Sequence, residues 1–316
     1  MFFRKIIKYL ILLMKTNLPA LLIILGLASS ANAGGGSIDY SSGGSNWKDG
    51  FCSNGTSQSP IDLPTSFSSP SGNSKKLVQS DVLDMIMNEG LIAGVKLNDL
   101  GTTYQIDFTN GILAMWTPDG VMSTYNLLQF HVHAPSEHTF DGKHYDLEIH
   151  FVHNQPGSSQ LAVVSVSFDV EDGGNESNDF IDALHVDYKN QSALTIPTMK
   201  LLGKLNYHNL YHYQGSLTTP PCSEVVNWLV VNDPQPISAI QLRNFNDKWM
   251  SNTTFAHGHG NNRVTQPINS RYVYLKANAD SLLASSGISS LMQGLQKTLV
   301  GVFSLHFFYS IQTIFN

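Results

Sequence analysis

Polar and apolar residues alternate along one short segment of the chain. The polar side chains belong to Gln129, His131 and His133, and Phe130 and Val132 stand between them. In a β-strand successive side chains point to opposite faces, so the three polar residues would share one face. Two imidazoles placed in this way can bind one metal ion, although two unrelated strand histidines would give the same pattern.

A second segment repeats this alternation. The segment LEIHFVH at 147–153 carries His150, with Glu148 two residues before it on the same face. If the two segments are neighbouring strands, three imidazoles converge, from His131, His133 and His150. Three neutral nitrogen ligands at about 2.0–2.1 Å that leave a fourth position open are typical of a catalytic zinc site, whereas structural sites are closed. The pattern therefore predicts Zn²⁺ as cofactor.

A polar residue stands two positions before a histidine on each segment. Gln129 and Glu148 are placed to hydrogen-bond the ring nitrogen that does not bind the metal, which fixes the tautomer and orientation of the imidazole. The other nine histidines have no such neighbours. We interpret His257 and His259, which lie in a Gly-rich stretch, as surface residues.

Short apolar segments must position these side chains. They recur with Gly, Asn and Asp between them, and their lengths and spacing suit strands of a β-rich fold. Two stretches, 178–189 and 237–250, have helical patterns. The predicted strands are 91–95, 104–108, 112–116, 127–133, 147–153, 161–170 and 225–231.

The composition restricts the class of protein. The chain has 316 residues, 18 Lys and Arg against 24 Asp and Glu, and a net charge of −6, so no nucleic-acid partner is expected. Two cysteines are too few for a disulfide-framework miniprotein or a Cys-only zinc site.

The first 33 residues resemble a secretory signal peptide. Cations precede an apolar run at 18–27, and Ala31 and Ala33 occupy the −3 and −1 positions of a cleavage site. An uncleaved anchor is the alternative, but each apolar run is shorter than the roughly 20 residues that span a bilayer. We therefore expect an exported protein, periplasmic or extracellular.

The last 40 residues differ from the rest of the chain. No linker divides 34–276, which we interpret as one domain, and 277–316 is an apolar extension of unknown role. Leu282, Leu283, Ile288 and later leucines have loose helical spacing. We expect the extension to pack on the domain or a partner, and association with a membrane or with itself is the alternative.

Several motifs, in chain order, resemble those of the α-class carbonic anhydrases. They span about residues 40–275 and are QSPID at 58–62, SEH at 136–138, EIHFV at 148–152, GSLTTPP at 215–221, and Arg263, Gln266-Pro267 and Arg271. The resemblance implies an exported, disulfide-containing member. It also implies a mainly β (α+β) fold, with a single domain around a large twisted mixed, mostly antiparallel β-sheet and short peripheral helices.

The resemblance implies a reaction as well. A zinc lyase of this family, a carbonate dehydratase, hydrates CO₂ reversibly to bicarbonate and a proton by zinc-hydroxide attack. Zinc with three neutral ligands, here His131, His133 and His150, retains its positive charge and lowers the pKa of bound water to about 7, a known property of such sites. The expected partners are therefore the small molecules CO₂ and bicarbonate.

By the same resemblance Thr218 and Glu137 are catalytic. A buried carboxylate can only accept hydrogen bonds, so the Thr218 hydroxyl donates to Glu137 and accepts from the hydroxide. Taken alone, the two residues would be a loop-stabilising hydroxyl and a surface acid. Thr219 resembles the residue that contacts bicarbonate, and Tyr40 and Tyr213 match positions behind the ligands or beside the cavity.

An apolar substrate needs an apolar wall. By resemblance it is formed by residues that would also suit an ordinary core, Val152, Val163, Leu217, Val226 and Trp228. Cys52 and Cys222 fall where exported members carry a disulfide, and Ser59-Pro60 and Pro220-Pro221 match the family's cis peptide bonds.

The sequence departs from the family at the proton-shuttle position. Many members have a histidine there, whereas this chain has Thr102, which does not titrate near pH 7. We therefore expect slower, buffer-dependent turnover. Two framework tryptophans of the family are replaced by Ile38 and Asn262.

Two other functions use the same residues. The first is a non-catalytic binding protein on the same fold, although such relatives typically lack a zinc ligand and this chain keeps all three. The second is a zinc esterase, in which the same hydroxide attacks activated esters.

Overall fold

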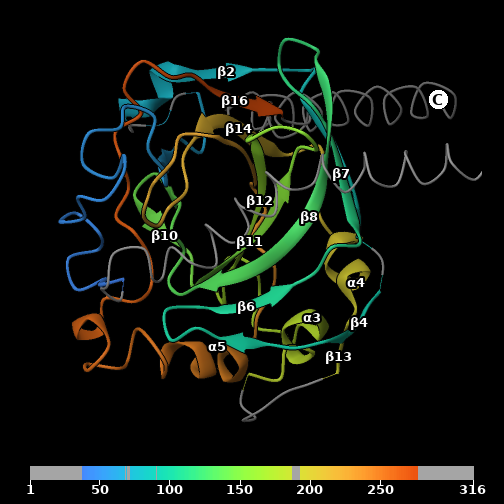
Figure 1. The fold of residues 1–316 in the computed structure, drawn as a ribbon, viewed down its shortest axis with the longest axis vertical. Helices are drawn as coiled ribbons and strands as arrows, with labels where there is room; N and C mark the ends of the chain where they lie inside the picture. The colour runs from blue at the N-terminus through green and yellow to red at the C-terminus, as the bar shows by residue number, and fades with distance from the viewer. Residues whose placement is uncertain (1–37, 68, 70–71, 90, 187–192, 277–316) are drawn as a thin grey trace, which may run out of the picture.

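Strands dominate the computed structural model, which describes residues 38–67, 69, 72–89, 91–186 and 193–276 (Figure 1). The predicted signal peptide at 1–33, the extension at 277–316 and residues 187–189 of a predicted helix lie outside the described residues. Among those described, no helix is both long and apolar enough to cross a membrane.

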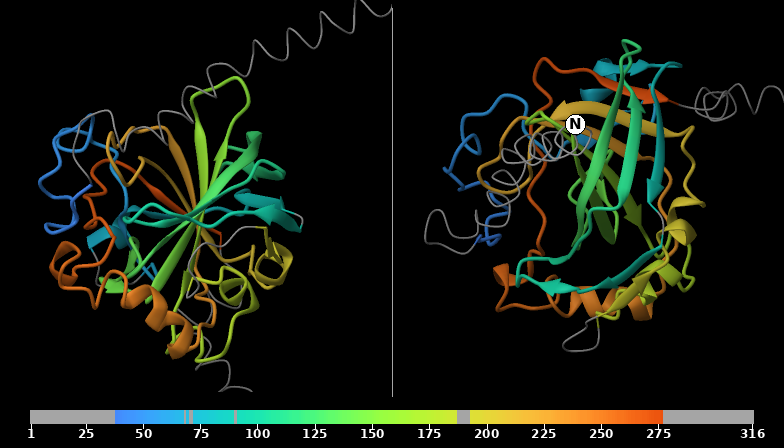
Figure 2. Two further views of the ribbon diagram at one scale, coloured as in Figure 1. Left: turned by 60° about the horizontal axis from the view of Figure 1, so that its bottom comes forward. Right: turned by 45° about the vertical axis from the view of Figure 1, so that its right-hand side comes forward.

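One large sheet runs through the molecule. Its strands are β2 (Leu77–Gln79), β3 (Asp84–Glu89), β5 (Asn98–Asp99), β6 (Tyr104–Asp107), β7 (Gly111–Trp116), β8 (Met122–His133), β11 (Leu147–Asn154), β12 (Leu161–Phe168), β14 (Leu210–Gly215), β15 (Val226–Val231) and β16 (Val273–Lys276). Their order is β2-β16-β14-β15-β12-β11-β8-β6-β5, and β7 pairs with both β8 and β3. Figure 2 shows that the strands fan out with a strong twist. The β12–β15 and β2–β16 pairs are parallel and the others antiparallel, which confirms the predicted mixed sheet.

Smaller elements surround this sheet. Two small sheets contain β1 (Asp62–Leu63), β9 (Thr139–Phe140) and β10 (Lys143–His144), and β4 (Ile92–Val95) with β13 (Leu194–Ile196). The described helices are α3 (Asp179–Asp182), α4 (Thr198–Leu202), α5 (Ala239–Asn246), η1 (Gly72–Lys76) and η2 (Ala256–Gly258). All are short and lie at the periphery, as predicted (Figure 1).

The two predicted helical stretches contain α3 and α5, but both helices are shorter than expected. The Asn178 side chain caps α3, and Ser238 and Gln241 form a capping box on α5. These local hydrogen bonds fix where the helices begin. The sequence did not predict α4, because five residues are too few to show a 3.6-residue period.

The central strands are buried on both faces. All eight residues of β12 are buried, Ser165 and Ser167 among them, as expected of a strand that is covered on both faces. One face packs against a core that includes Phe130, Ile149 and Phe151. The opposite face carries a second cluster that includes Val152 and Trp228. The histidines of interest belong to this second face.

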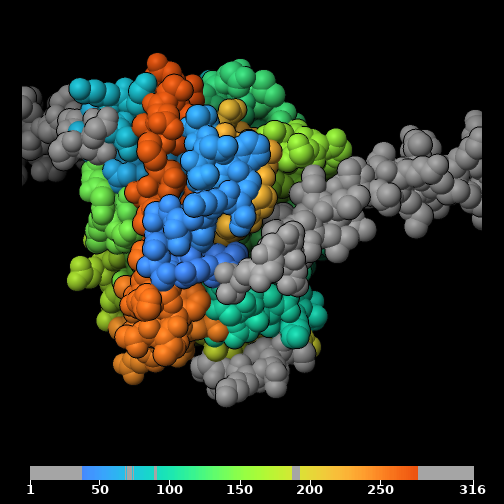
Figure 3. All heavy atoms as spheres, turned by 60° about the vertical axis from the view of Figure 1, so that its left-hand side comes forward, coloured from blue at the N-terminus to red at the C-terminus, as the bar shows by residue number. Residues whose placement is uncertain are grey.

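Segments from the two ends of the domain lie side by side on one face (Figure 3). Val264 donates its backbone N–H to the carbonyl of Gly43 at 2.9 Å, and Gln266 donates to Pro60 at 2.7 Å. Gly43 has a φ of +55° and lies against Val264, where a Cβ would approach within 2.5 Å. Glycine is therefore required at this close approach.

Candidate metal centre

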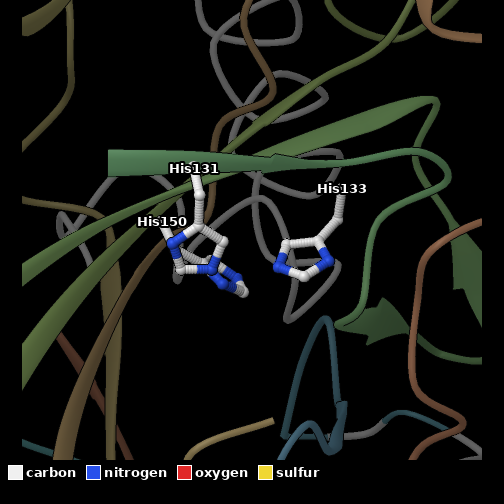
Figure 4. Close-up of side chains that lie close together, drawn as sticks. All are labelled: His131, His133 and His150. Atoms are coloured by element: carbon white, nitrogen blue, oxygen red, sulfur yellow. The ribbon is translucent and has the colours of Figure 1, made fainter. Parts of the chain in front are cut away.

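The two histidine-bearing strands are neighbours, as predicted. β8 and β11 are antiparallel, with His131 opposite His150 and His133 opposite Glu148. The three imidazole centroids lie 4.7–5.2 Å apart. Figure 4 shows the rings approaching one point from the two strands. Strand alternation and register together thus gather residues that are up to 19 positions apart in the sequence.

Two of the rings are held by the polar residues that precede them. The Gln129 Oε1 atom lies 2.9 Å from His131 Nδ1, and the Glu148 Oε1 atom lies 2.7 Å from His150 Nε2. Both contacts are those expected from the sequence. They leave His131 Nε2 and His150 Nδ1 free to bind a metal ion.

The third ring is held by a residue that the sequence analysis missed. His133 Nδ1 donates to the backbone carbonyl of Asn261 at 2.8 Å. The Asn261 side chain also accepts from Ala134 N–H at 2.7 Å and donates to the Thr102 carbonyl at 2.8 Å. No sequence signal links Asn261 to a strand 128 residues earlier.

The free nitrogen atoms fit a zinc ion. One ligand atom from each of His131, His133 and His150 lies within 4.8 Å of the others. His133 Nε2 is buried and has no hydrogen-bond partner. A buried nitrogen without a partner costs free energy, which a bound metal would recover. Three imidazoles and no fourth protein ligand are the donor set of a catalytic zinc site.

The electrostatics favour neutral imidazoles. Burial lowers the pKa of His133 to about 4, and it also lowers the pKa of His150. Burial, followed by the other two ring charges, holds the pKa of His131 well below its usual value. Only the neutral ring can donate a lone pair to a metal, so the three side chains are in the ligating form at neutral pH.

Glu148 connects the site to a wider buried network. Its Oε2 accepts the backbone N–H groups of Glu137 and His138 at 2.7 and 2.9 Å. Its Oε1 contacts His138 Nδ1 at 2.7 Å, and His138 Nε2 contacts the Tyr213 hydroxyl at 2.7 Å. Burial opposes ionisation of Glu148, but the charges of His138 and His150 outweigh it and hold its pKa well below the usual range.

This network corrects the prediction for the remaining histidines. The sequence pattern gave none of the other nine a polar neighbour of this kind, whereas the fully buried His138 contacts Glu148, ten residues later in the chain. His257 is exposed as expected, whereas His259 is half-buried. The ring nitrogens of His138 are hydrogen-bonded on both sides, so the alternative cluster of His138, Glu148 and His150 is less open to a metal.

Glu137 and Thr218 lie together beside the histidines. The fully buried Glu137 accepts the Arg263 backbone N–H at 2.8 Å. Burial raises the pKa of Glu137 to about 7, and His150, a hydrogen bond from Thr218 and that of Arg263 oppose the increase. Glu137 Oε2 lies 3.5 Å from His133 Nε2. The pair is therefore adjacent to the free ring nitrogens.

The turn that carries Thr218 is fixed on both sides. Ser216 and Ser59 exchange hydrogen bonds, with Ser59 N–H donating to Ser216 Oγ at 2.9 Å and Ser216 N–H donating to Ser59 Oγ at 3.0 Å. Trp228 Nε1 donates to the Ser216 carbonyl at 3.1 Å. Thr219 is partly exposed in the same turn, and its carbonyl accepts from Cys222 N–H.

A disulfide joins Cys52 and Cys222. The pairing is the predicted one, and it ties the segment after Thr219 to the N-terminal part of the domain. Arg263 reinforces the junction by donating to the Cys52 carbonyl at 3.1 Å. The Ser59-Pro60 and Pro220-Pro221 bonds are cis, as predicted, and so is Ala134-Pro135.

The predicted wall residues form one apolar surface next to the metal centre. Val226 belongs to the cluster that contains Val152 and Trp228, and Leu217 packs against this cluster. One row of the sheet crosses five adjacent strands in register: Gln129, Val152, Val163, Trp228 and Tyr213. This row lies two residues along β8 and β11 from the pair of His131 and His150. Residues two apart on a strand face the same side, so the wall and the three histidines share a face.

Tyr40 and Thr102 complete the predicted set. Tyr40 is buried, with its ring centroid 5.3 Å from that of Trp47, and burial followed by the charge of Glu137 raises its pKa. Thr102 is half-buried and connects through Asn261 to His133. The structure thus places Thr102 next to the metal centre, with no imidazole at that position.

A large mixed sheet that brings two buried histidines and the half-buried His131 to one point defines a class, the β-sheet proteins with a three-histidine cluster that could hold a metal ion. Comparison with known proteins gives the family. Residues 42–277 match the model of the eukaryotic-type carbonic anhydrases. The chain belongs to this carbonic anhydrase family.

Individual relatives agree with this assignment. A carbonic anhydrase of Klebsiella pneumoniae is 35% identical over 223 residues, which cover 70% of this chain and 81% of that protein. Alpha carbonic anhydrase 3 of Arabidopsis thaliana is 32% identical, covering 72% and 76%. The solved α-carbonic anhydrase of Thermovibrio ammonificans, in complex with the inhibitor sulfanilamide, is 33% identical with a TM-score of 0.56, covering 71% of this chain and 89% of that one.

Proposed function

We propose that this protein hydrates CO₂ reversibly to bicarbonate and a proton with Zn²⁺ held by His131, His133 and His150. The observation that carries the proposal is the group of three free imidazole nitrogens within 4.8 Å of one another. When bound, zinc acts as a Lewis acid that makes water a nucleophile near neutral pH. The chain belongs to a carbonic anhydrase family, which supports CO₂ as the substrate.

The residues around the ligands orient them. Gln129, Glu148 and the Asn261 carbonyl each engage one ring nitrogen. These contacts set the tautomers, so the opposite nitrogen carries a lone pair toward the metal. The negative charge of Glu148 also increases the basicity of the His150 ring, which strengthens that ligand.

Thr218 and Glu137 determine which group donates and which accepts in the hydrogen bonds at the nucleophile. With a pKa of about 7, Glu137 is ionised above neutral pH; in this form it can only accept, so the hydrogen bond between the two side chains requires Thr218 to donate. The Thr218 oxygen then keeps its lone pairs and accepts a hydrogen bond from the nucleophile, which orients it toward the carbon of CO₂. Thr219, the next residue, is partly exposed, and its role in this proposal is to contact bicarbonate.

The apolar wall binds CO₂ and excludes water. Val152, Val163, Val226 and Trp228 are each 2–3% exposed, so their contribution is a packed surface of fixed shape. CO₂ makes few hydrogen bonds, and apolar contact is the interaction such a molecule can use. Leu217, next to Thr218, extends the wall toward the catalytic pair.

We also propose that residues 34–276 form the working domain of an exported protein and that residues 1–33 are removed. The disulfide between Cys52 and Cys222 supports this, because disulfides persist mainly in oxidising compartments. The compartment is then the periplasm or the exterior.

Metal analysis combined with a CO₂ hydration assay tests the function. The purified protein should contain about one zinc per chain and hydrate CO₂. His150→Ala should lose the zinc and lower kcat/KM by about a hundredfold or more, because a ligand contributes at least as much as the residues that orient it. His208→Ala, at an exposed histidine, is the matched control and should change neither quantity. Full hydration activity without zinc, or in His150→Ala, would contradict the proposal.

A further inference from the structure

The outer face of the ribbon β3–β7–β8 is apolar and exposed. Strand alternation turns Met85, Leu113 and Met115 into the core and the residues between them outward. We call the outward side the ribbon face. Its large apolar members on the strands are Ile86, Ile112, Trp116 and Met122, and Val82 and Val121 lie just before β3 and β8. Apart from the half-buried Trp116, each is 50–59% exposed.

The ribbon face has almost no charge. Of the outward-facing residues of these strands, all within the described part of the chain, Asp84 alone is charged, and it is paired with Lys276. About a quarter to a third of the residues on an ordinary soluble surface are charged. A contiguous apolar surface of this kind marks an interaction site.

The described chain ends at the corner of this face. Lys276 is the last described residue, and its Nζ lies 2.8 Å from Asp84 Oδ1 at the start of β3. The preceding residue, Leu275, accepts the backbone N–H of Ser80 at 3.0 Å. Lys276, the last described residue, therefore reaches Asp84 with its side chain, and Val82 and Ile86 are two residues from Asp84 on either side.

The sequence of the remaining 40 residues complements the ribbon face. Asp280 and Lys297 are the only charged residues in 277–316. In 282–295 the apolar residues have helical spacing, and a helix of this length would measure about 20 Å. The six-residue strands β3 and β7 also measure about 20 Å.

We propose that residues 277–316 dock on the ribbon face, with 282–295 lying along β3 and β7. Attachment at Lys276 makes docking intramolecular, at an effective concentration in the millimolar range for a short linker. A second copy of the chain would compete at micromolar concentration or below. The tethered segment is therefore the preferred occupant, and it covers the exposed side chains of Ile86 and Ile112.

Thiol labelling of the full chain tests the docking. Ile86→Cys should react about tenfold or more slowly than Ile240→Cys, although isoleucine is 59% and 74% exposed at these positions in the described structure. Adding Leu291→Asp and Leu295→Asp should restore fast labelling at position 86 and leave position 240 unchanged. CO₂ hydration should remain the same in all variants, because none changes a residue of the proposed metal centre or of the apolar wall.

Four results would overturn the proposal. One is equally fast labelling at both positions in chains whose mass shows that residues 277–316 are present. Another is protection that rises with protein concentration, since this would identify a second copy as the occupant. The third is protection that appears only when phosphatidylcholine vesicles are added, since this would identify a membrane. Mass spectrometry showing that 277–316 are removed from the secreted protein would also exclude docking.

Photo-crosslinking gives an independent, positive readout. A benzophenone amino acid in place of Ile112 should capture a peptide from 282–316 of the same chain, with a yield that does not depend on protein concentration. The same probe in place of Ile240 is the matched control and should capture none of it. Capture confined to peptides of a second molecule would refute the intramolecular contact.

Discussion

At the scale of the residue, the hydrogen-bond partners of each side chain in the site determine its ionisation and which of its atoms are left free. The Glu148 carboxylate accepts from two backbone N–H groups and contacts His138 and His150. A carboxylate with these partners stays ionised in a buried site. His133, by contrast, depends on a backbone carbonyl and keeps one buried nitrogen unpaired. An orienting group such as Glu148 has protein partners at both carboxylate oxygens, whereas His133, a proposed metal ligand, has one buried nitrogen without a partner.

A larger side chain in the wall should block CO₂ without removing the metal. Val163 is 2% exposed between Val152 and Trp228, so Val163→Tyr places a ring where the substrate would bind. We expect kcat/KM to fall by about a hundredfold or more with zinc content unchanged. Val163→Ala, which only enlarges the space, is the matched control. Wild-type activity in the tyrosine variant would show that the wall lies elsewhere.

The threonine at the shuttle position predicts a dependence on buffer. Thr102 lies next to the metal centre but carries no group that titrates near pH 7. CO₂ hydration should therefore accelerate when imidazole is added, and Thr102→His should raise kcat at low buffer by about tenfold. Thr102→Val controls for the loss of the hydroxyl and should not raise it. A wild-type rate that is independent of buffer would mean that another group carries the proton.

At the scale of the element, the strands present the histidine cluster on one face and a purely structural core on the other. On β14, Tyr211 and Tyr213 join the cluster on the metal side, while His212 points to the opposite side. His212 is 3% exposed; its Nε2 lies 3.4 Å from Asn227 Oδ1 and its Nδ1 has no hydrogen-bond partner. Burial lowers the pKa of His212 to about 4.

His212 should make the domain less stable in acid. In the unfolded chain its pKa is about 6.5, so between pH 6.5 and 4 the unfolded state binds more protons than the folded state. The contribution is complete above pH 6.5 and is lost as the pH falls, to a total of about 3 kcal/mol. Urea unfolding at pH 7 and 4.5 should show a loss about 2–3 kcal/mol larger in wild type than in His212→Leu. Equal losses in the two proteins would contradict this assignment.

At the scale of the whole molecule, the active segments are held by connections between distant parts of the chain. The disulfide closes a loop across a sequence separation of 170 residues, beside the turn that carries Thr218. Arg263 adds hydrogen bonds to Gln58, Ser59 and Cys52 in the N-terminal segment. The first and last parts of the domain therefore fix the turn that carries Thr218 together.

Removing the disulfide should destabilise the domain strongly. The chain-entropy model gives up to about 5 kcal/mol for a loop of this length. Cys52→Ser with Cys222→Ser should lower the free energy of unfolding by several kcal/mol, measured with urea, and should lower activity at 37 °C. The wild type in a reducing agent provides the matched comparison. Unchanged stability in both would show that hydrogen bonds alone hold this junction.

Much of the fold could be predicted from local patterns, and the failures have physical causes. β8 and β11 were recognisable because strand alternation is a local property. β14 was missed because His212 and Gln214 interrupt its apolar residues. Its strand conformation is evident only from its pairing with β15. The helix bounds were too long mainly at their C-terminal ends, because apolar residues such as Leu184 and Trp249 continue beyond the last residues of α3 and α5.

The sequence by itself determined which side chains could do the chemistry, because a two-residue period places His131 and His133 on one face of any strand. Only the tertiary structure decided that His150 lies opposite His131, that Asn261 holds the third ring, and that an apolar ribbon face adjoins Lys276. These features depend on strand register and on contacts between residues far apart in the chain. Neither is encoded in a local pattern, because each is fixed only when the whole sheet and its covering segments pack together.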